Sequence, residues 1–307
     1  MDNLGACGWL QGKAVLDVGC GTGVLAMFGL MAGAGKAIGV DSSRTVHDAT
    51  AVSMANGFGD GTGSAGPLRL IRSRLEDLPE SELPPCGMTG ASHGGAGGVD
   101  VLVSEWMGYA LLFESMLTSV LVARDRFLRP GGVLMPDSAT IFVEAVCDPC
   151  YHRRHVGFWG DVYGLDMGAL EGRSAERPHV GVVPQAAIGS DRAIARRFDL
   201  LAVRDEELDF ESDLVLRNAK RTFMNRPSPT ALPGAVVGTS AHMMDIVYGL
   251  AISFDTGFDA RPFPGPPSPS ASGSSGTGAA DLPGKPPSGY SPVNLSTRPD
   301  ESPTHWA

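Results

Sequence analysis

The sequence predicts an α/β protein whose first half is a doubly wound parallel sheet and whose second half is mostly antiparallel β structure. In the first half, short apolar runs that end near glycine alternate with segments that repeat their apolar residues at helical spacing. After about residue 139, apolar and β-branched runs follow one another with turn residues between them. The sequence therefore divides into a parallel-sheet domain at 1–139 and a β domain at 140–307.

The elements expected in the first half follow from local sequence. Residues 14–18 and 36–40 are short apolar runs, which are typical of buried parallel strands. Residues 24–32 lie between them with the apolar periodicity of a helix, and Gly33 and Gly35 favour its end. Further strands are expected at 68–71, at 99–103 and from residue 132, and a helix is expected at 116–127.

The second half is expected to contain strands at 140–146, 198–203, 208–216 and 235–254. Two segments interrupt the predicted domains without any periodicity. Residues 84–98 are rich in glycine, and residues 261–292 consist largely of Pro, Ser and Gly. Such segments bury too little apolar surface to offset the entropy lost on ordering, so both are expected to be flexible insertions.

Composition excludes several classes of function. The formal net charge is −10, and phosphate binding needs a basic face, so nucleic acid is not expected as a direct partner. No apolar run reaches the ~18 residues that a membrane helix needs, and the N-terminus lacks the features of a secretory signal. The five cysteines are unevenly spaced, which favours a reducing compartment, so we expect a cytoplasmic or nuclear protein.

A glycine-rich loop follows the first expected strand, with the spacing G-x-G-x-G at Gly19, Gly21 and Gly23. Glycines there let the backbone turn tightly and approach a ligand closely. Asp41 follows the second expected strand, where a carboxylate can accept the ribose hydroxyls of a nucleoside. Asp17 adds a second acid, which suits the positive charges of S-adenosylmethionine better than the phosphates of a dinucleotide. The alternative is a glycine-rich turn with a helix-capping aspartate.

Two glutamates flank an aromatic, glycine-containing segment after the strand expected at 99–103. Residues 104–117 read SEWMGYALLFESML, and Glu105 and Glu114 lie nine residues apart. Ligands bind at the carboxyl ends of strands in open α/β sheets, and two facing carboxylates there are costly unless they hold a cation. A guanidinium is the natural cation, because it pairs bidentately with carboxylates. The alternative is a solvated glutamate and a glutamate that starts a helix.

Residues 104–117 resemble, nearly residue for residue, the double-glutamate hairpin of the protein arginine N-methyltransferases, and most of all that of the type I enzymes. The glycine loop resembles the cofactor loop of that family, residues 158–167 resemble the start of its dimerisation arm, and residues 303–306 resemble its Thr-His-Trp loop. The resemblance implies a Rossmann-like class I methyltransferase domain followed by a β-barrel domain with a helical dimerisation arm at about 156–176.

The resemblance also implies a role for each matching residue. The implied cofactor is S-adenosyl-L-methionine, and its implied binding residues are Asp17, Gly19, Gly21, Gly23, Asp41, Glu76 at the adenine amino group and Met107 near the sulfonium. Asp77 takes the place of Glu76 if the alignment shifts by one residue. The implied catalytic residues are Glu105, Glu114 and His305, and the implied substrate-binding residues are Tyr109, Met116 and Trp306. Glu114 and His305 are both candidates for the proton acceptor.

No metal is expected. Cys147 and Cys150 form a CxxC that is followed directly by HxxH, without the loop that zinc modules place between their ligand pairs. Asp17 lies only sixteen residues from Met1, whereas the family carries two helices before this strand. We therefore expect the chain to lack those lid helices and the end of the barrel.

The implied reaction is methyl transfer to arginine in Arg-Gly-rich protein segments by a homodimer, giving mono- and asymmetric dimethylarginine. Three alternatives to this reaction remain. The first is a catalytically inactive or partner-dependent homologue or fragment, and the second is a small-molecule methyltransferase. The third is an NAD oxidoreductase, which the G-x-G-x-G spacing and the glutamate hairpin disfavour.

Overall fold

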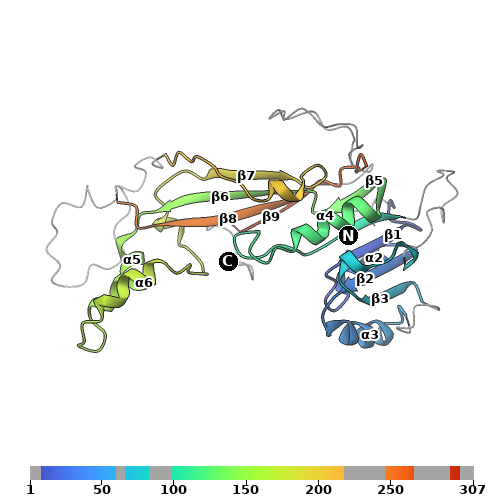
Figure 1. Ribbon diagram of the computed structural model, residues 1–307, viewed down its shortest axis with the longest axis horizontal. Coiled ribbons are helices and arrows are strands. Elements are labelled where there is room, and N and C mark those ends of the chain that lie inside the picture. Colours follow the sequence, from blue (N-terminus) through green and yellow to red (C-terminus); the bar gives the residue numbers. More distant parts are fainter. Residues whose placement is uncertain (1–7, 60–65, 83–97, 218–245, 266–290, 298–307) are drawn as a thin grey trace.

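The computed structural model describes residues 8–59, 66–82, 98–217, 246–265 and 291–297. They form one five-stranded parallel sheet and one four-stranded antiparallel sheet (Figure 1). The parallel sheet lies at one end of an elongated molecule, and the short helices α5 (Pro149–His155) and α6 (Glu171–Ala175) lie at the other end. The α/β class and the Rossmann-like parallel sheet expected from the sequence are confirmed.

The parallel sheet has the strand order β3-β2-β1-β4-β5, with β1 at its centre. The chain adds β2 and β3 on one side of β1, and then crosses over to add β4 and β5 on the other side. Its strands are β1 (Ala14–Val18), β2 (Lys36–Asp41), β3 (Leu68–Arg72), β4 (Val99–Val103) and β5 (Leu128–Met135). The helices beside it are α2 (Val24–Met31), α3 (Thr45–Ala55) and α4 (Leu117–Phe127). The central strands are apolar and buried, as expected for a parallel sheet that is covered on both faces.

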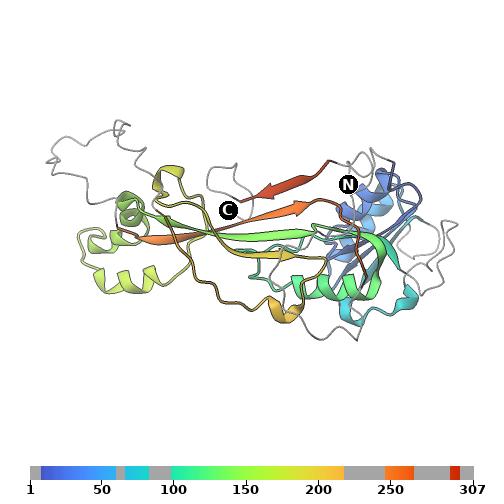
Figure 2. The same cartoon turned by 90° about the horizontal axis from the view of Figure 1, so that it is seen from above.

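Neighbouring residues of β1 face two separate hydrophobic cores. Val15 belongs to the core that contains Ala26 of α2, whereas Leu16 belongs to the core that contains Val120 and Leu121 of α4. Because successive side chains of a strand point to opposite faces, α2 and α4 lie on opposite sides of the sheet (Figure 2).

The second sheet has the strand order β7-β6-β8-β9, and all its strand pairs are antiparallel. Its strands are β6 (Ser138–Val146), β7 (Ala193–Asp199), β8 (Gly249–Phe258) and β9 (Val293–Ser296).

Short 3₁₀ turns lie at η1 (Leu75–Asp77), η2 (Glu80–Glu82), η3 (Gly157–Gly160), η4 (Gly168–Leu170), η5 (Gln185–Ala187) and η6 (Asp205–Glu207). Among the described helices, none is long and apolar enough to cross a membrane.

The structure corrects two of the strands that were expected from apolar composition. The strand expected at 198–203 ends at Asp199, because the amides of Ala202 and Val203 donate to the carbonyl of Asp199 and turn the chain. Residues 208–216 are described and form no strand. Their apolar residues Leu208 and Phe210 instead pack against the core from a loop.

Two further corrections concern the first half. Helix α3 is absent from the expected elements, because the side chains that it buries, Val46, Ala49 and Ser53, are too small and too few to give a helical apolar pattern. Strand β5 begins at Leu128 rather than Gly132, so the Arg-Pro-Gly-Gly sequence lies inside the strand and not before it.

The flexible insertion expected at 261–292 cannot begin at Arg261. Phe263 is buried in the core, and its amide and carbonyl pair with Gly132 and Gly131 at 2.7 Å each. Residues 266–290 of that insertion, and nearly all of the insertion expected at 84–98, lie outside the described residues.

A buried aspartate lies where the chain passes from the parallel sheet to the antiparallel sheet. Asp137 lies between β5 and β6 with none of its surface exposed. Its carboxylate accepts hydrogen bonds from the backbone amide of Arg261 at 2.9 Å and from that residue's Nε at 3.4 Å. Arg261 also donates to Asp199 Oδ1 at 2.8 Å, so one guanidinium links the start of β6 to the end of β7. Burial raises the pKa of Asp137 above its usual value, and the hydrogen bond and charge of Arg261 offset only part of this rise.

We predict that Asp137→Ala lowers the free energy of unfolding by about 2–3 kcal/mol, because it removes the carboxylate that accepts from the backbone amides of Asp259 and Arg261 and leaves Asp199 as the remaining carboxylate of Arg261. Urea unfolding followed by tryptophan fluorescence measures this loss. The control is Glu207→Ala, which removes a solvent-exposed pair with Arg204 and is expected to cost at most about 1 kcal/mol. A loss at Asp137 no larger than the loss at Glu207 would contradict this view of the junction.

Candidate active site

The carboxyl ends of the parallel strands meet at one edge of the sheet. Val18 pairs with Val40, and Asp17 pairs with Val103, so the loops after β1, β2 and β4 start side by side. Two hydrogen bonds join these loops directly. The amide of Gly19 donates to Val40 O at 2.8 Å, and the buried hydroxyl of Ser104 donates to Val18 O at 2.7 Å.

The glycine loop has a backbone that other residues rarely adopt. Gly19, Gly21 and Gly23 have φ angles of 70°, 52° and 78°, all in the left-handed region. A side chain at Gly19 would also collide with Cε of Met116, whereas a Cβ at Gly21 would meet nothing. Gly19 therefore allows the glutamate hairpin to contact the loop, and Gly21 leaves the outer face of the loop open.

Asp17 is a buried acid with an unsatisfied oxygen. Its Oδ2 accepts from the amide of Ala26 at 3.0 Å, which caps the first turn of α2. Its Oδ1 has no hydrogen-bond partner among the residues that the structure describes. Burial, and to a lesser extent the charge of Asp41, raise the pKa of Asp17 to about 7. A buried carboxylate in this state is suited to a cationic hydrogen-bond donor.

Asp41 fixes the glycine loop and remains charged. Its Oδ2 accepts from the amide of Gly21 at 2.9 Å, and its Oδ1 accepts from the amide of Ser43 at 2.8 Å. Burial raises the pKa of this carboxyl, but the hydrogen bonds from Ser43 and Gly21 outweigh it and leave the pKa below its usual range. Each oxygen keeps a further lone pair, so the carboxylate can accept two ligand hydroxyls.

Glu76 lies in η1, directly after β3, and α4 holds it in place. Its Oε1 accepts from the hydroxyl of Ser119 at 2.6 Å, which is the largest of the effects that lower the pKa of Glu76. Arg126 of the same helix donates to the carbonyls of Glu76 and Leu78 at 2.8 Å each. Asp77, the alternative residue, is exposed.

Ser104, Ser119 and Arg126 hold parts of the candidate site in place, and the sequence did not predict them. Ser119 and Arg126 are seven residues apart, which places both on one face of α4. The sequence shows this spacing, but the residues near Ser119 and Arg126 do not indicate that this face of the helix contacts η1. Ser104 carries no such signal, because its partner is a backbone carbonyl far away in the chain.

The glutamate hairpin is a tight and strained loop. The backbones of Gly108 and Leu111 exchange two hydrogen bonds, at 3.0 and 2.9 Å. Ala110, Leu111 and Ser115 have φ angles of 51°, 76° and 55°, a conformation that costs roughly 1–3 kcal/mol for each such residue. Leu111 is fully buried and anchors the loop in the core. Strain of this kind gathers at functional sites.

The hairpin presents its two glutamates to solvent. Glu105 and Glu114 lie at its two ends, and both are exposed. Glu114 packs closely over Gly108, since a Cβ built on that glycine would lie 3.0 Å from Glu114 Cγ. Met107 is buried, and the exposed rings of Tyr109 and Phe113 lie 6.4 Å apart.

The predicted residues thus fall into two groups within the described part of the chain. The first group lies along the sheet edge or in contact with it: Asp17, Gly19, Gly21, Gly23, Asp41 and Met116. The second is the hairpin with its exposed carboxylates. His305 and Trp306 lie outside the described residues. Searched over the same described residues, His, Cys, Asp and Glu form no group of three that could hold a metal ion.

Two family models match the chain. Residues 137–261 match the arginine methyltransferase oligomerization subdomain, and residues 6–59 match the ribosomal protein L11 methyltransferase model. A probable protein arginine N-methyltransferase 3 of Oryza sativa is 34% identical over 99% of this chain, and protein arginine N-methyltransferase 1 of Schizosaccharomyces pombe is 38% identical over 69% of it. The chain spans about half the length of these relatives, 42% and 57% respectively.

Two solved structures of protein arginine methyltransferases are also similar to this chain. The Trypanosoma brucei PRMT1 enzyme-prozyme heterotetrameric complex with AdoHcy matches with a TM-score of 0.70 and 29% identity, over 99% of this chain and 74% of that one. Arabidopsis thaliana protein arginine methyltransferase 10 has the same fold, with a TM-score of 0.63 at 24% identity, over 99% and 75% of the two chains. On its sequence, its site geometry and these comparisons, the chain belongs to the protein arginine N-methyltransferase family.

Proposed function

We propose that this chain transfers a methyl group from S-adenosyl-L-methionine to a guanidinium nitrogen of arginine in protein substrates. The observation that carries the proposal is the contact of Met116 with Gly19, because it joins the glutamate hairpin to the glycine loop. A loop suited to a nucleoside cofactor and a pair of carboxylates suited to a guanidinium then share one site. The relatives named as arginine N-methyltransferases support the same activity.

The residues at the sheet edge fit the cofactor. The unsatisfied Oδ1 of Asp17 suits its ammonium group, and the charged carboxylate of Asp41 suits its two ribose hydroxyls. Glu76, held by Ser119, suits the adenine amino group. The glycine loop itself, with the sequence GCGTG, contains no Lys or Arg for the phosphates of a dinucleotide.

When bound, S-adenosyl-L-methionine supplies an electrophilic methyl group on a sulfonium. Glu105 and Glu114 orient the arginine by accepting hydrogen bonds from its guanidinium. They also hold positive charge on the nitrogens that they contact, which leaves the third nitrogen with more of its lone pair for attack. Holding the reactants in near-attack geometry can lower the barrier by up to roughly 7–11 kcal/mol. Glu114 and His305 are the two groups of the proposed site that can accept the proton.

We extend this proposal to the substrates and products. Arg-Gly-rich segments are basic, and the net charge of −10 attracts them. Mono- and asymmetric dimethylarginine are the proposed products, on the type I resemblance of residues 104–117. A cytoplasmic or nuclear location is proposed on the uneven spacing of the five cysteines.

We also propose a homodimer in which the arm of one copy packs on α2 of the other. The match to an oligomerization subdomain supports an assembly of this kind. On the arm, Tyr163 and Leu165 project from a turn closed by Val162, and Leu165 is 65% exposed. On α2, Phe28 and Met31 are exposed apolar side chains. Covering both apolar surfaces at once favours the association of two copies.

We predict that Asp41→Ala weakens the binding of S-adenosyl-L-methionine by roughly 10–100-fold, because two charge-assisted hydrogen bonds to the ribose are lost. Isothermal titration calorimetry measures the affinity. Asp48→Ala, which removes a carboxylate from the first turn of α3, is the control and is expected to bind normally. Equal affinities for the two variants would remove Asp41 from the cofactor site.

We predict that Glu105→Gln lowers the rate of arginine methylation by about 10²–10³, because it weakens the electrostatic hold on the guanidinium. Cofactor affinity stays unchanged, since Glu105 is on the hairpin and not on the glycine loop. Mass spectrometry of a Gly-Arg-Gly peptide measures the rate, and calorimetry measures the affinity. A normal rate would refute the role of Glu105. A wild-type chain that binds cofactor but methylates no peptide would favour the inactive or partner-dependent alternative.

We predict that Leu165→Asp converts the proposed dimer to a monomer, because it places a charge in the apolar contact. Sedimentation velocity measures the assembly state. Val215→Asp is the matched control, because Val215 is 69% exposed but lies outside the arm, and this variant is expected to remain a dimer. A Leu165→Asp variant that sediments like the wild type would contradict the proposed interface.

A further inference from the structure

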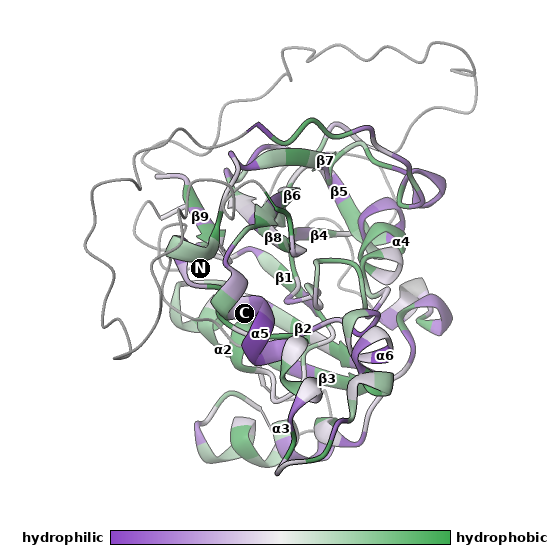
Figure 3. Cartoon of the chain, turned by 90° about the vertical axis from the view of Figure 1, so that its left-hand side faces the viewer, coloured by the Kyte–Doolittle hydropathy of each residue, from purple (hydrophilic) through white to green (hydrophobic). Residues whose placement is uncertain are grey.

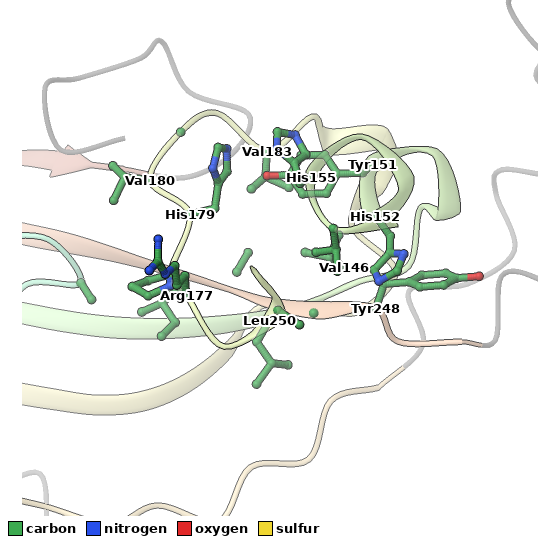
Figure 4. A pocket seen from close by; sticks show the side chains of 18 of the residues that line it. Val146, Tyr151, His152, His155, Arg177, His179, Val180, Val183, Tyr248 and Leu250 are labelled. Carbon is green, nitrogen blue, oxygen red and sulfur yellow. The ribbon is translucent and has the colours of Figure 1, made fainter. Parts of the chain in front are cut away.

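A cleft of about 530 Å³ lies between the arm and the antiparallel sheet (Figure 4). Its lining comes from the tip of the glutamate hairpin, helix α5, the segment 174–183 and the first half of β8. The volume is within the range of about 300–1,000 Å³ that is typical of ligand sites. Of the predicted site residues, Tyr109 lines this cleft. The cleft therefore adjoins the proposed active site but is separate from the cofactor edge.

One part of the cleft is an apolar surface. Leu250 and Ile252 of β8 line it and are 61% and 55% exposed. Val180 and Val182 of the segment 174–183 are also exposed and line the same cleft. Apolar side chains gathered in a concave surface favour a ligand that carries apolar groups of its own.

Another part of the cleft is a wall of aromatic rings that contact one another at tilted angles. The ring of His155 lies 4.3 Å from that of Tyr151 and 4.3 Å from that of His179. The ring of His152 lies 5.0 Å from that of Tyr248. Figure 4 shows these side chains, from α5, the segment 174–183 and the start of β8, around the open space. Flat rings with N–H and O–H groups can contact an apolar side chain and donate hydrogen bonds to a carboxylate.

The charges around the cleft favour an anion. Arg177 lines it, and the ion pairs found within the described residues do not include this arginine. Helix α5, which Figure 3 shows as strongly hydrophilic, adds Arg153 and Arg154 beside the lining. Glu176 is the acidic residue of the lining. This local surplus of cations contrasts with the net charge of −10, which attracts the basic Arg-Gly segment to the molecule as a whole. The cleft itself therefore suits a part of the substrate outside that segment.

We propose that this cleft holds the part of a protein substrate that flanks the target arginine, and that it favours flanks with carboxylate and apolar side chains. The inference rests on the proposed function. Tyr109 and Ala110 form the tip of the hairpin and also line the cleft, so a substrate whose arginine lies between Glu105 and Glu114 extends from the hairpin into it. Arg177 then pairs with a carboxylate of the flank, and the apolar surface that contains Leu250 and Ile252 covers the apolar side chains of the flank.

Fluorescence anisotropy with two labelled peptides of equal length tests this inference. Both contain one Gly-Arg-Gly; one has a flank of Gly and Ser, and the other has a flank that contains Asp, Leu and Phe. We expect the acidic, apolar flank to bind roughly tenfold more tightly, as one added charge-assisted hydrogen bond provides. Equal affinities, or tighter binding of a third peptide with a lysine-rich flank, would overturn the proposal.

Matched variants locate the effect. Arg177→Gln is expected to remove most of the preference for the acidic flank while it leaves the affinity for the Gly-Ser flank unchanged. Arg173→Gln is the control, because Arg173 is an exposed arginine of α6 outside the lining. If the two variants retain the same preference, the cleft is not the site of selection.

The same peptides distinguish this inference from the proposed function. A fourth peptide keeps the acidic flank but has Gln in place of the arginine, and it is expected to retain a preference that depends on Arg177. If methyl transfer fails while this preference persists, the proposed function falls and the cleft remains a site for acidic, apolar peptides. If arginine is methylated without any flank preference, the proposed function stands and this inference falls.

Discussion

The parallel pairing of β1 with β2 on one side and β4 on the other is the constraint on which the proposed site depends. It brings the ends of all three strands to one edge, and the hydrogen bonds from Gly19 to Val40 and from Ser104 to Val18 then hold the loops together. The glycine loop, Asp41 and the hairpin come from segments up to about one hundred residues apart in sequence. Their proximity follows from strand order alone.

The proposed site combines carboxyl groups whose pKa values are shifted in opposite directions. Burial favours the protonated form of Asp17, whereas hydrogen bonds keep Asp41 ionised. The two hairpin glutamates remain exposed, on a backbone that three left-handed residues hold under strain. Packing in the core thus stabilises a hairpin whose backbone is unfavourable by itself. The buried side chain of Leu111 connects the hairpin to the core.

Much of this arrangement could be predicted from sequence, because its signals are local. Short apolar strands, glycine spacing and an acid after a strand depend on neighbouring residues, and they located Asp17, the glycines and Asp41. The contacts that sequence reasoning missed are long-range. Arg261 lies 124 residues from Asp137, and Ser119 lies 43 residues from Glu76, so neither pair leaves a periodic or spaced pattern. Residues 200–203 are apolar and largely buried in a loop, and the sequence predicts a strand there because apolar composition does not reveal backbone pairing.

A crystal structure of the chain with S-adenosyl-L-homocysteine tests the central claim most directly. The account predicts that the ribose hydroxyls lie within hydrogen-bond distance of the Asp41 carboxylate, that the amino group of the ligand reaches Asp17, and that the adenine amino group reaches Glu76. A ligand bound elsewhere, or a nucleoside that leaves both Asp41 and Glu76 without contact, would contradict the assignment of this sheet edge as the cofactor site.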